Sequence, residues 1–251
     1  MNLLISFRSE LLKTKRTAAF YLAFVTGTFG LLIYMLDFLT DGVSPESKPI
    51  IFNEMMTDKF QVAAFLLFPL FIILTCTLLP QIEYKNNAWK QVLASPQQKW
   101  MVFVSKFLNV QLFIIVFLLT DLLMMLLGAV LLHFIDPTLD VLNQPVDVKE
   151  IFRIRASAYV ALLAMCALQF WLGLRMKNFI TPIGIGIALW ITGTILVSEL
   201  KADFAEYFPY SYHVISNEKL GNNNYLWFSL MYAVLFLVLG FLDFRKKRVN
   251  N

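Results

Sequence analysis

Charged residues are scarce in this sequence. They make up 15% of its 251 residues, whereas hydrophobic residues make up 59%. A soluble domain of this length could not cover its surface with so few polar groups. The stretches between the hydrophobic runs reach only about 25 residues, which is too short to bury a core of their own. The composition therefore excludes a separate soluble domain and indicates a protein that lies mainly in a lipid bilayer.

Cysteine and histidine occur only twice each. Because Cys76 and Cys166 fall within hydrophobic runs, the sequence excludes a disulfide framework and predicts that both thiols pack inside helices. His133 and His213 lie in different segments outside these runs, so no metal site is expected. A membrane enzyme would need a cluster of reactive side chains at one depth. We therefore expect no catalytic residues in this chain.

The sequence also lacks a phosphate-binding loop of the form G-x-x-x-x-G-K-[ST]. The pair Gly184 and Gly186 lies within a hydrophobic run, where it favours close helix packing over nucleotide binding. If ATP drives this protein, another polypeptide must bind the ATP and Mg, and we expect no cofactor on this chain. The net charge of +4 reflects basic residues at the membrane boundaries and does not indicate nucleic-acid binding.

Six hydrophobic runs are long enough to cross a hydrocarbon core of ~30 Å, which takes a helix of ~20 residues. We predict membrane spans at 17–39, 61–82, 106–132, 156–175, 178–198 and 225–243. When the N-terminus is placed inside, most of the 21 Lys and Arg residues fall on the cytoplasmic side, which is the usual bias of short loops. The sequence thus predicts an all-α, multi-pass membrane protein with both termini in the cytoplasm.

Residues 1–16 precede the first span and have a helical pattern of their own. Leu4, Phe7 and Leu11 share one face of a helix, whereas Arg8 and Lys15 lie elsewhere on it. We predict an amphipathic helix that lies in the inner membrane interface. The alternative is a disordered tail that only supplies positive charge.

The loop at 83–105 carries a second short amphipathic pattern. Trp89, Val92 and Leu93 stand at i, i+3 and i+4, and Pro96 ends the helix that they would form. An apolar face of this size must be buried against another surface. That surface is either a partner protein or the membrane interface, with Trp89 as the anchor.

The order of these features resembles the ABC-2 type export permeases, especially the compact permeases of lantibiotic-protection exporters. The matching features are the basic amphipathic N-terminal helix, Glu83 at the end of the second span, a short helix that ends in Leu93-Ala94-Ser95-Pro96, and Lys106 at the start of the third span. The resemblance covers the whole chain in architecture, but at the level of motifs it covers only residues 83–106. It implies a single six-helix domain with the ABC-2 (type V exporter-like) fold, in the cytoplasmic (inner) membrane of a bacterium.

In that family, the loop after the second span is a coupling helix that rests on a separate ABC ATPase subunit. The resemblance therefore implies two ATPase subunits in the complex, together with a second copy of this permease or a related one. The ATPase-coupling residues would be Glu83, Trp89, Val92, Leu93 and Pro96. The segment 199–224 would form short re-entrant helices on the outer side, with an ordinary aromatic belt as the alternative.

Small residues in the first and fifth spans are consistent with the same resemblance to ABC-2 permeases. Glycine lets two helix backbones approach closely. In the family these two helices face each other across a dimer. The candidate residues for such a dimer seam are Gly27, Gly30, Gly184, Gly186 and Gly193.

Asp121 is the one charged residue within the hydrophobic runs and not at their ends, and a charge at that depth is costly. It marks either a transport pathway or a hydrogen-bonded packing contact. Asn109 and Gln111 lie too far toward the cytoplasm to be its partners.

The function that follows is export of an amphipathic or lipid-like substrate, such as an antimicrobial peptide or a drug, because the lining would be mostly apolar. The alternative is an ion-coupled secondary transporter. Folds of that kind show inverted repeats and polar residues within the membrane, and the six runs hold few such residues.

Overall fold

The computed structural model describes residues 3–15, 17–42, 50–89, 92, 97–218 and 224–246. Within these residues the chain is helical and contains no strand. Six stretches are long and apolar enough to cross a membrane, so the all-α prediction with six spans is confirmed. In chain order the helices are α1 (Leu3–Thr14), α2 (Ala18–Asp41), α3 (Ile51–Glu54), the π-helical turn η2 (Met55–Lys59), α4 (Phe60–Lys85), α6 (Lys99–Ile135), η3 (Pro137–Leu139), η4 (Val141–Asn143), α7 (Val148–Arg175), α8 (Ile180–Ser198), η5 (Asp203–Tyr207), α9 (Tyr212–Glu218) and α10 (Asn224–Lys246).

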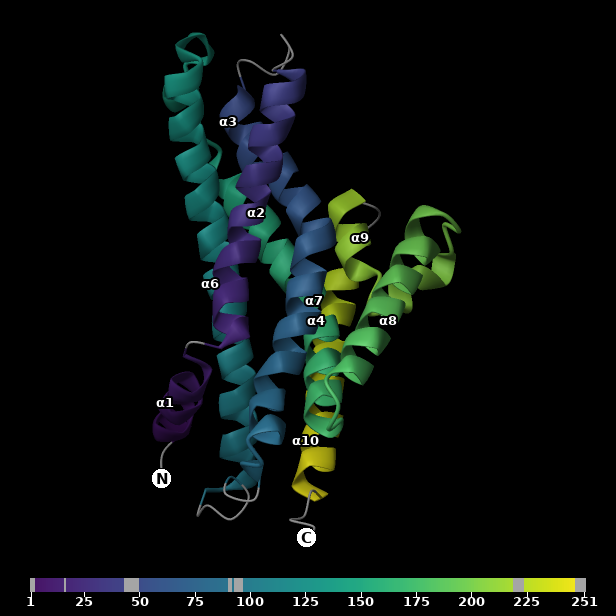
Figure 1. Cartoon of the computed structure of the whole chain (residues 1–251). Helices are drawn as coiled ribbons and strands as arrows, with labels where there is room; N and C mark the ends of the chain where they lie inside the picture. The colour runs from purple at the N-terminus through teal and green to yellow at the C-terminus, as the bar shows by residue number, and fades with distance from the viewer. Residues whose placement is uncertain are drawn as a thin grey trace.

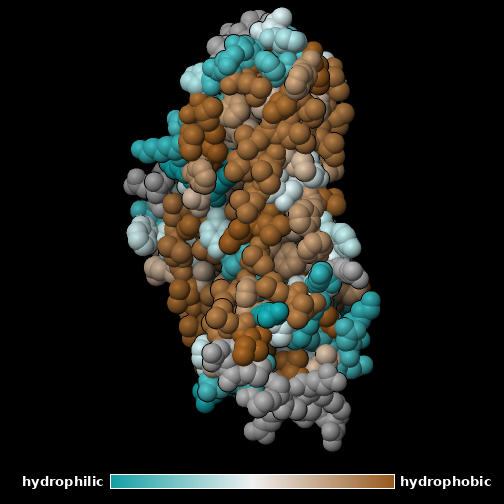
Figure 2. Space-filling model, turned by 90° about the vertical axis from the view of Figure 1, so that its left-hand side faces the viewer, coloured by the Kyte–Doolittle hydropathy of each residue, from teal (hydrophilic) through white to brown (hydrophobic). Residues whose placement is uncertain are grey.

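The ends predicted to be cytoplasmic lie together. Helix α1, the end of α4, the α7–α8 connection and the end of α10 all gather at the lower end of the molecule in Figure 1. Figure 2 shows large hydrophobic areas along the length of this face, with most hydrophilic residues near its two ends and fewer at mid height and along the left edge. This arrangement suits a protein whose middle is surrounded by lipid.

Three helical stretches extend well beyond the hydrophobic runs that predicted them. Helices α3, η2 and α4 form one stretch of 35 residues, α6 has 37 residues, and α7 begins eight residues earlier than the predicted start at 156, at Val148. At ~1.5 Å per residue, α6 is ~55 Å long and exceeds a hydrocarbon core of ~30 Å. Capping fixes the start of α7, because the side chain of Asp147 accepts a hydrogen bond from the backbone N–H of Glu150.

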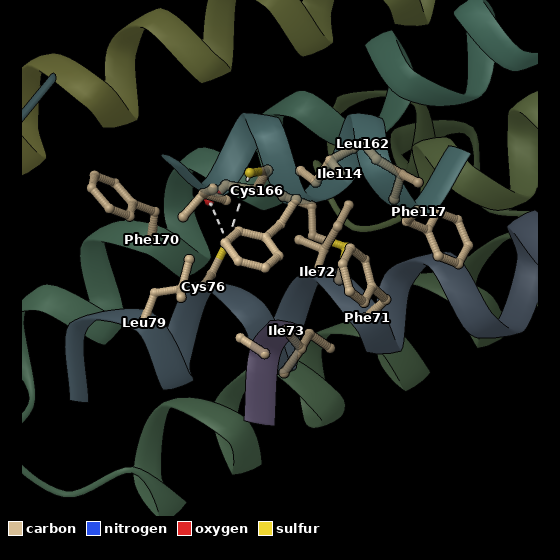
Figure 3. Close-up of a cluster of buried hydrophobic side chains, with 14 of the residues drawn as sticks. Phe71, Ile72, Ile73, Cys76, Leu79, Ile114, Phe117, Leu162, Cys166 and Phe170 are labelled. Carbon is tan, nitrogen blue, oxygen red and sulfur yellow. Dashed lines mark hydrogen bonds between the residues drawn. The ribbon is translucent and has the colours of Figure 1, made fainter. Parts of the chain in front are cut away.

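The core lies where α4, α6 and α7 meet (Figure 3). A Cβ atom on Gly173 of α7 would stand 2.3 Å from the carbonyl oxygen of Cys76, so α4 and α7 are in direct backbone contact there. The Sγ atoms of Cys76 and Cys166 are 3.7 Å apart, and both thiols are free and buried. The ring of Phe117 on α6 stacks on Phe71 of α4, with centroids 4.9 Å apart. The prediction that the cysteines pack inside helices is therefore confirmed.

The segment after α8 forms the short helices η5 and α9. Tyr210 and Tyr212 are buried, whereas Phe204 and Tyr207 on η5 are 61% and 57% exposed. Helix α9 packs against α4, α7 and α8. The short helices expected at 199–224 are present, and their depth in a membrane stays a prediction.

Candidate functional site

Helix α1 is attached to the bundle by its polar face. Ser6, Glu10 and Thr14 recur every four residues, so they share one side of the helix, and all three are buried. The hydroxyl oxygen of Ser6 lies 3.0 Å from that of Ser105 on α6. Leu4, by contrast, is 78% exposed. The N-terminal segment is thus an amphipathic helix, as expected, with outward apolar residues that suit a membrane interface. The sequence did not predict that its polar face would dock on α6.

Four charged side chains meet where α1, α4 and α6 come together. The ammonium group of Lys106 donates to Glu10 at 2.8 Å and also to Glu83. Lys13 donates to Glu10 at 2.6 Å and to Glu83 at 3.1 Å. Two carboxylates and two ammonium groups cancel in charge, which lowers the cost of burying them together. We call Glu10, Lys13, Glu83 and Lys106 the ionic cluster.

The ionic cluster shifts the acid–base behaviour of its members on α1. Burial raises the pKa of Glu10, but the ammonium groups of Lys106 and Lys13 outweigh burial and hold that pKa below its ordinary value of 4.5. Burial likewise lowers the pKa of Lys13, and the carboxylate of Glu10 reverses the effect and raises it. Both groups are therefore charged at neutral pH.

Glu83 is buried in the ionic cluster, whereas an ATPase-coupling residue would be expected at the surface. Its side chain is buried between α1 and α6 and pairs with lysines of its own chain. Glu83 therefore does not offer its carboxylate to an ATPase surface in this structure. Its position instead connects the end of α4 to both neighbouring helices.

Trp89 also points into the chain. Helix α4 ends at Lys85, and Asn87 adopts a positive φ of 49°, which turns the backbone. The indole of Trp89 then lies against Tyr84, with ring centroids 5.2 Å apart, and against Phe244 of α10 at 6.0 Å. The Lys106 ammonium is 5.4 Å from the Trp89 ring centroid, which is within cation–π range.

This position changes the expected role of the loop's apolar face. Trp89 is 8% exposed, so it anchors the loop to the bundle and is not an outward side chain ready to fill a groove. The backbone N–H of Val92 donates to the carbonyl of Ala88 at 3.0 Å, as in a helical turn, and its side chain packs against the core. Leu93 and Pro96 lie outside the described residues, and their contact with an ATPase stays a prediction.

Asp121 has a partner that the sequence analysis missed. The guanidinium of Arg155 on α7 donates to its carboxylate at 3.2 Å, and both side chains are buried. The same guanidinium donates to the carbonyl of Met56 at 2.8 Å and lies 4.4 Å from the ring centroid of Phe60. Arg155 lies one residue before the predicted start of the fourth span at 156, so the sequence pattern alone leaves it outside that span. Asp121 is therefore half of a buried ion pair that joins α6 to α7.

The glycines expected at a dimer seam mostly face their own chain. A Cβ atom on Gly27 would stand 2.8 Å from Thr120, and one on Gly30 would stand 3.1 Å from Met125, both on α6. The corresponding distances are 2.7 Å from Gly186 to the Gln169 side chain and 2.3 Å from Gly193 to the Tyr210 carbonyl oxygen. Close packing within the bundle accounts for these four residues, and their place at a seam between copies stays a prediction. Gly184 differs from them, because a Cβ atom there would have nothing within 4 Å and the position is open to a second copy.

Signals for the missed residues exist in the sequence. Ser6, Glu10 and Thr14 form a polar stripe at helical spacing, and Glu83 and Lys106 are opposite charges at neighbouring span ends. Arg155 could have been found by extending the fourth helix by one residue at its outer end. Each of these side chains needs a buried partner once it is placed on a helix face.

The family of the chain follows from its sequence together with this architecture. A family model described as ABC-2 family transporter protein matches residues 6–193, which is well over half of the chain. No match to a curated protein was found. The matched region begins in α1, contains the ionic cluster and the Asp121–Arg155 pair, and ends in α8. The chain is a multi-pass membrane protein that belongs to the ABC-2 family of transporters.

Proposed function

We propose that this chain is the membrane-spanning permease subunit of an ATP-binding cassette exporter. A separate ATPase subunit, present in two copies, would supply the energy, and a second copy of this chain or a related permease would complete the complex. The complex would lie in the inner membrane of a bacterium with both termini of the chain in the cytoplasm. Membership of the ABC-2 family supports this proposal, as does the gathering of α1, the end of α4 and the end of α10 at one end of the bundle (Figure 1).

The observation that carries the mechanism is the attachment of the loop to three helices. Trp89 packs on Phe244 of α10 and over Lys106 of α6. Lys106 in turn pairs with Glu10 of α1. A push on the loop by an ATPase would therefore reach α1, α6 and α10 through direct contacts. Coupling would proceed through movement of packed helices, without chemistry on this chain.

Exposed apolar residues support a hydrophobic or amphipathic substrate. Leu32 and Leu36 on α2 are 55% and 63% exposed, and Ile191 on α8 is 46% exposed. These faces would contact lipid, a second permease or a substrate taken from the bilayer. An antimicrobial peptide, a drug and a lipid all have the required chemistry.

Co-purification tests the proposal. The tagged chain is expressed together with a candidate ABC ATPase from the same genome, and both recovery of the ATPase and ATP hydrolysis are measured per membrane-inserted molecule. Leu93→Asp should weaken ATPase recovery by roughly 30-fold, since loss of one buried anchor typically costs ~2 kcal/mol of binding. The control, Leu142→Asp, makes the same change at the opposite end of the bundle, where the side chain is 47% exposed, and should leave recovery unchanged. Equal recovery in both variants would contradict a coupling role for this loop.

The alternative of an ion-coupled secondary transporter rests on Asp121, the carboxylate buried at membrane depth. Its partner Arg155 weakens that reading, because a carboxylate held by a guanidinium is a poor proton carrier. Transport in proteoliposomes discriminates between the two functions. An ATP-driven exporter requires the ATPase and ATP, whereas a secondary transporter requires only an ion gradient.

A further inference from the structure

A pocket opens between the ends of α7 and α10. It lies at the same end of the molecule as Trp89 and the end of α4. It has a volume of about 240 Å³. Its lining residues are Trp171, Leu174, Arg175, Gly240, Asp243, Phe244 and Lys246. Neither the coupling proposal nor the Asp121–Arg155 pair uses these side chains, apart from the contact of Phe244 with Trp89.

The pocket has two cations and a carboxylate that is already engaged. Arg175 and Lys246 stand in the last turns of α7 and α10 and are exposed. Among the described residues, neither forms a salt bridge. The carboxylate of Asp243 accepts a hydrogen bond from the indole N–H of Trp171 at 3.1 Å. The pocket therefore has a net positive charge, with two groups available to an anion.

The position of the pocket selects the kind of anion. It lies at the ends of two membrane-spanning helices, where phospholipid headgroups begin. Leu174 and Phe244 are buried apolar walls, and Trp171 is an aromatic side chain with a polar tip, which is typical of the interface. The lack of a side chain at Gly240 brings Trp171 close to the α10 backbone, since a Cβ atom there would be 3.2 Å from the Trp171 side chain. A pocket with cations at its rim and apolar walls matches a phosphate group attached to acyl chains.

We propose that this pocket binds an anionic phospholipid, with Arg175 and Lys246 holding the lipid phosphate and Trp171 and Phe244 contacting the glycerol and upper acyl region. Inorganic phosphate has the same anionic chemistry but lacks the apolar part that the walls would bury. Phe244 also packs on Trp89 and on Phe103 of α6, at 6.0 and 5.8 Å between ring centroids. A lipid in the pocket would therefore support the side chain that anchors the loop.

Lipid retention by the purified full-length chain tests the proposal. Native mass spectrometry measures bound phosphatidylglycerol after exchange from vesicles of phosphatidylglycerol and phosphatidylcholine. The variant is Arg175→Gln/Lys246→Gln. The matched control is Lys177→Gln/Arg245→Gln, which removes the same charge at neighbouring exposed positions that do not line the pocket. Affinity should fall roughly 30-fold in the pocket variant, because each basic side chain near an anionic surface contributes about a fivefold effect. The control should change by less than about threefold.

Three outcomes would overturn the assignment. Equal loss in both double variants would show a general attraction of the basic end to anionic lipid. Unchanged retention in the pocket variant would show that these side chains hold no lipid. Displacement of the lipid by equimolar sodium phosphate would show a site for a small anion. Circular dichroism checks that the variants fold, and Arg175→Lys, which keeps the charge, should retain phosphatidylglycerol.

Discussion

Replacing Asp121 with Asn tests the buried ion pair that joins α6 to α7. The carboxylate of Asp121 and the guanidinium of Arg155 are 3.2 Å apart, and the side chains are 1% and 7% exposed. The amide keeps the shape of the carboxylate but removes its charge. Arg155 would keep its hydrogen bond to Met56 and its contact with Phe60, but its positive charge would have no counter-ion in this contact.

The loss of unfolding free energy in Asp121→Asn distinguishes two roles of Asp121. If the residue were a hydrogen-bonded packing group, Asp121→Asn would change the free energy of unfolding by no more than about 1 to 2 kcal/mol. Removing one member of a buried ion pair typically costs ~3–5 kcal/mol. We expect the larger loss. The variant Asp121→Leu/Arg155→Met removes both charges and should recover most of it, because a buried pair can be replaced by apolar residues at little cost.

Unfolding in detergent, followed for the wild type, Asp121→Leu, Arg155→Met and the double variant, measures the coupling between the two positions. A loss below about 1 kcal/mol in Asp121→Asn, or a double variant that loses the sum of the two single effects, would refute the ion pair as the reason for burial of Asp121. Transport measured in parallel gives the second readout. A stable Asp121→Asn variant that assembles with an ATPase but no longer transports would place Asp121 on the pathway.

Two further predictions follow from the packing of glycine and from the ionic cluster. Gly173→Ala should destabilise the chain by ~1–3 kcal/mol in a thermal unfolding assay, because its Cβ would meet the Cys76 carbonyl oxygen at 2.3 Å. Gly184→Ala, where no atom lies within 4 Å, should stabilise α8 by ~0.5–1 kcal/mol, and equal effects of the two changes would contradict the packing. For Glu10, a pKa held below 4.5 means that the carboxylate adds stability above that pH and loses it as the pH falls through the lowered value. Glu10→Gln should therefore be less stable than the wild type at pH 7, and the difference should shrink below about pH 4.5 in melting curves; a constant difference would exclude Glu10 as the titrating group.

The number of helices could be predicted from the sequence because bilayer thickness acts on each span separately. A hydrophobic run of membrane length needs no knowledge of its neighbours to be recognised. The helix ends could not be predicted in this way. Helices α6 and α7 continue past the apolar runs, since capping and backbone hydrogen bonds determine where a helix ends. This difference placed Arg155 in a loop and left Asp121 without a partner.

The candidate site could be predicted only in part from the sequence, for a second reason. Spacing at i, i+3 and i+4 indicates which side chains share a face, but it does not indicate what that face contacts. Trp89 and Val92 turn toward Phe244 and the core, a contact that joins residues more than 150 positions apart. The same holds for Gly27, whose close neighbour is Thr120 on another helix. Contacts of this kind depend on tertiary packing, which a single sequence does not display.

The π-helical turn η2 determines the rotational register of the preceding helix α3. A π turn holds one residue more than a regular helical turn, because its hydrogen bonds run from i to i+5. Deleting one residue between Met55 and Lys59 would restore a regular helix and rotate the preceding residues by ~100° about the axis. Phe52 would then leave the cluster that it forms with Met125 and Leu132, and the carbonyl of Met56 would leave Arg155. The extra residue thus sets which side chains of α3 face the cluster with Met125 and Leu132, and it does so at the point where the arginine binds the backbone.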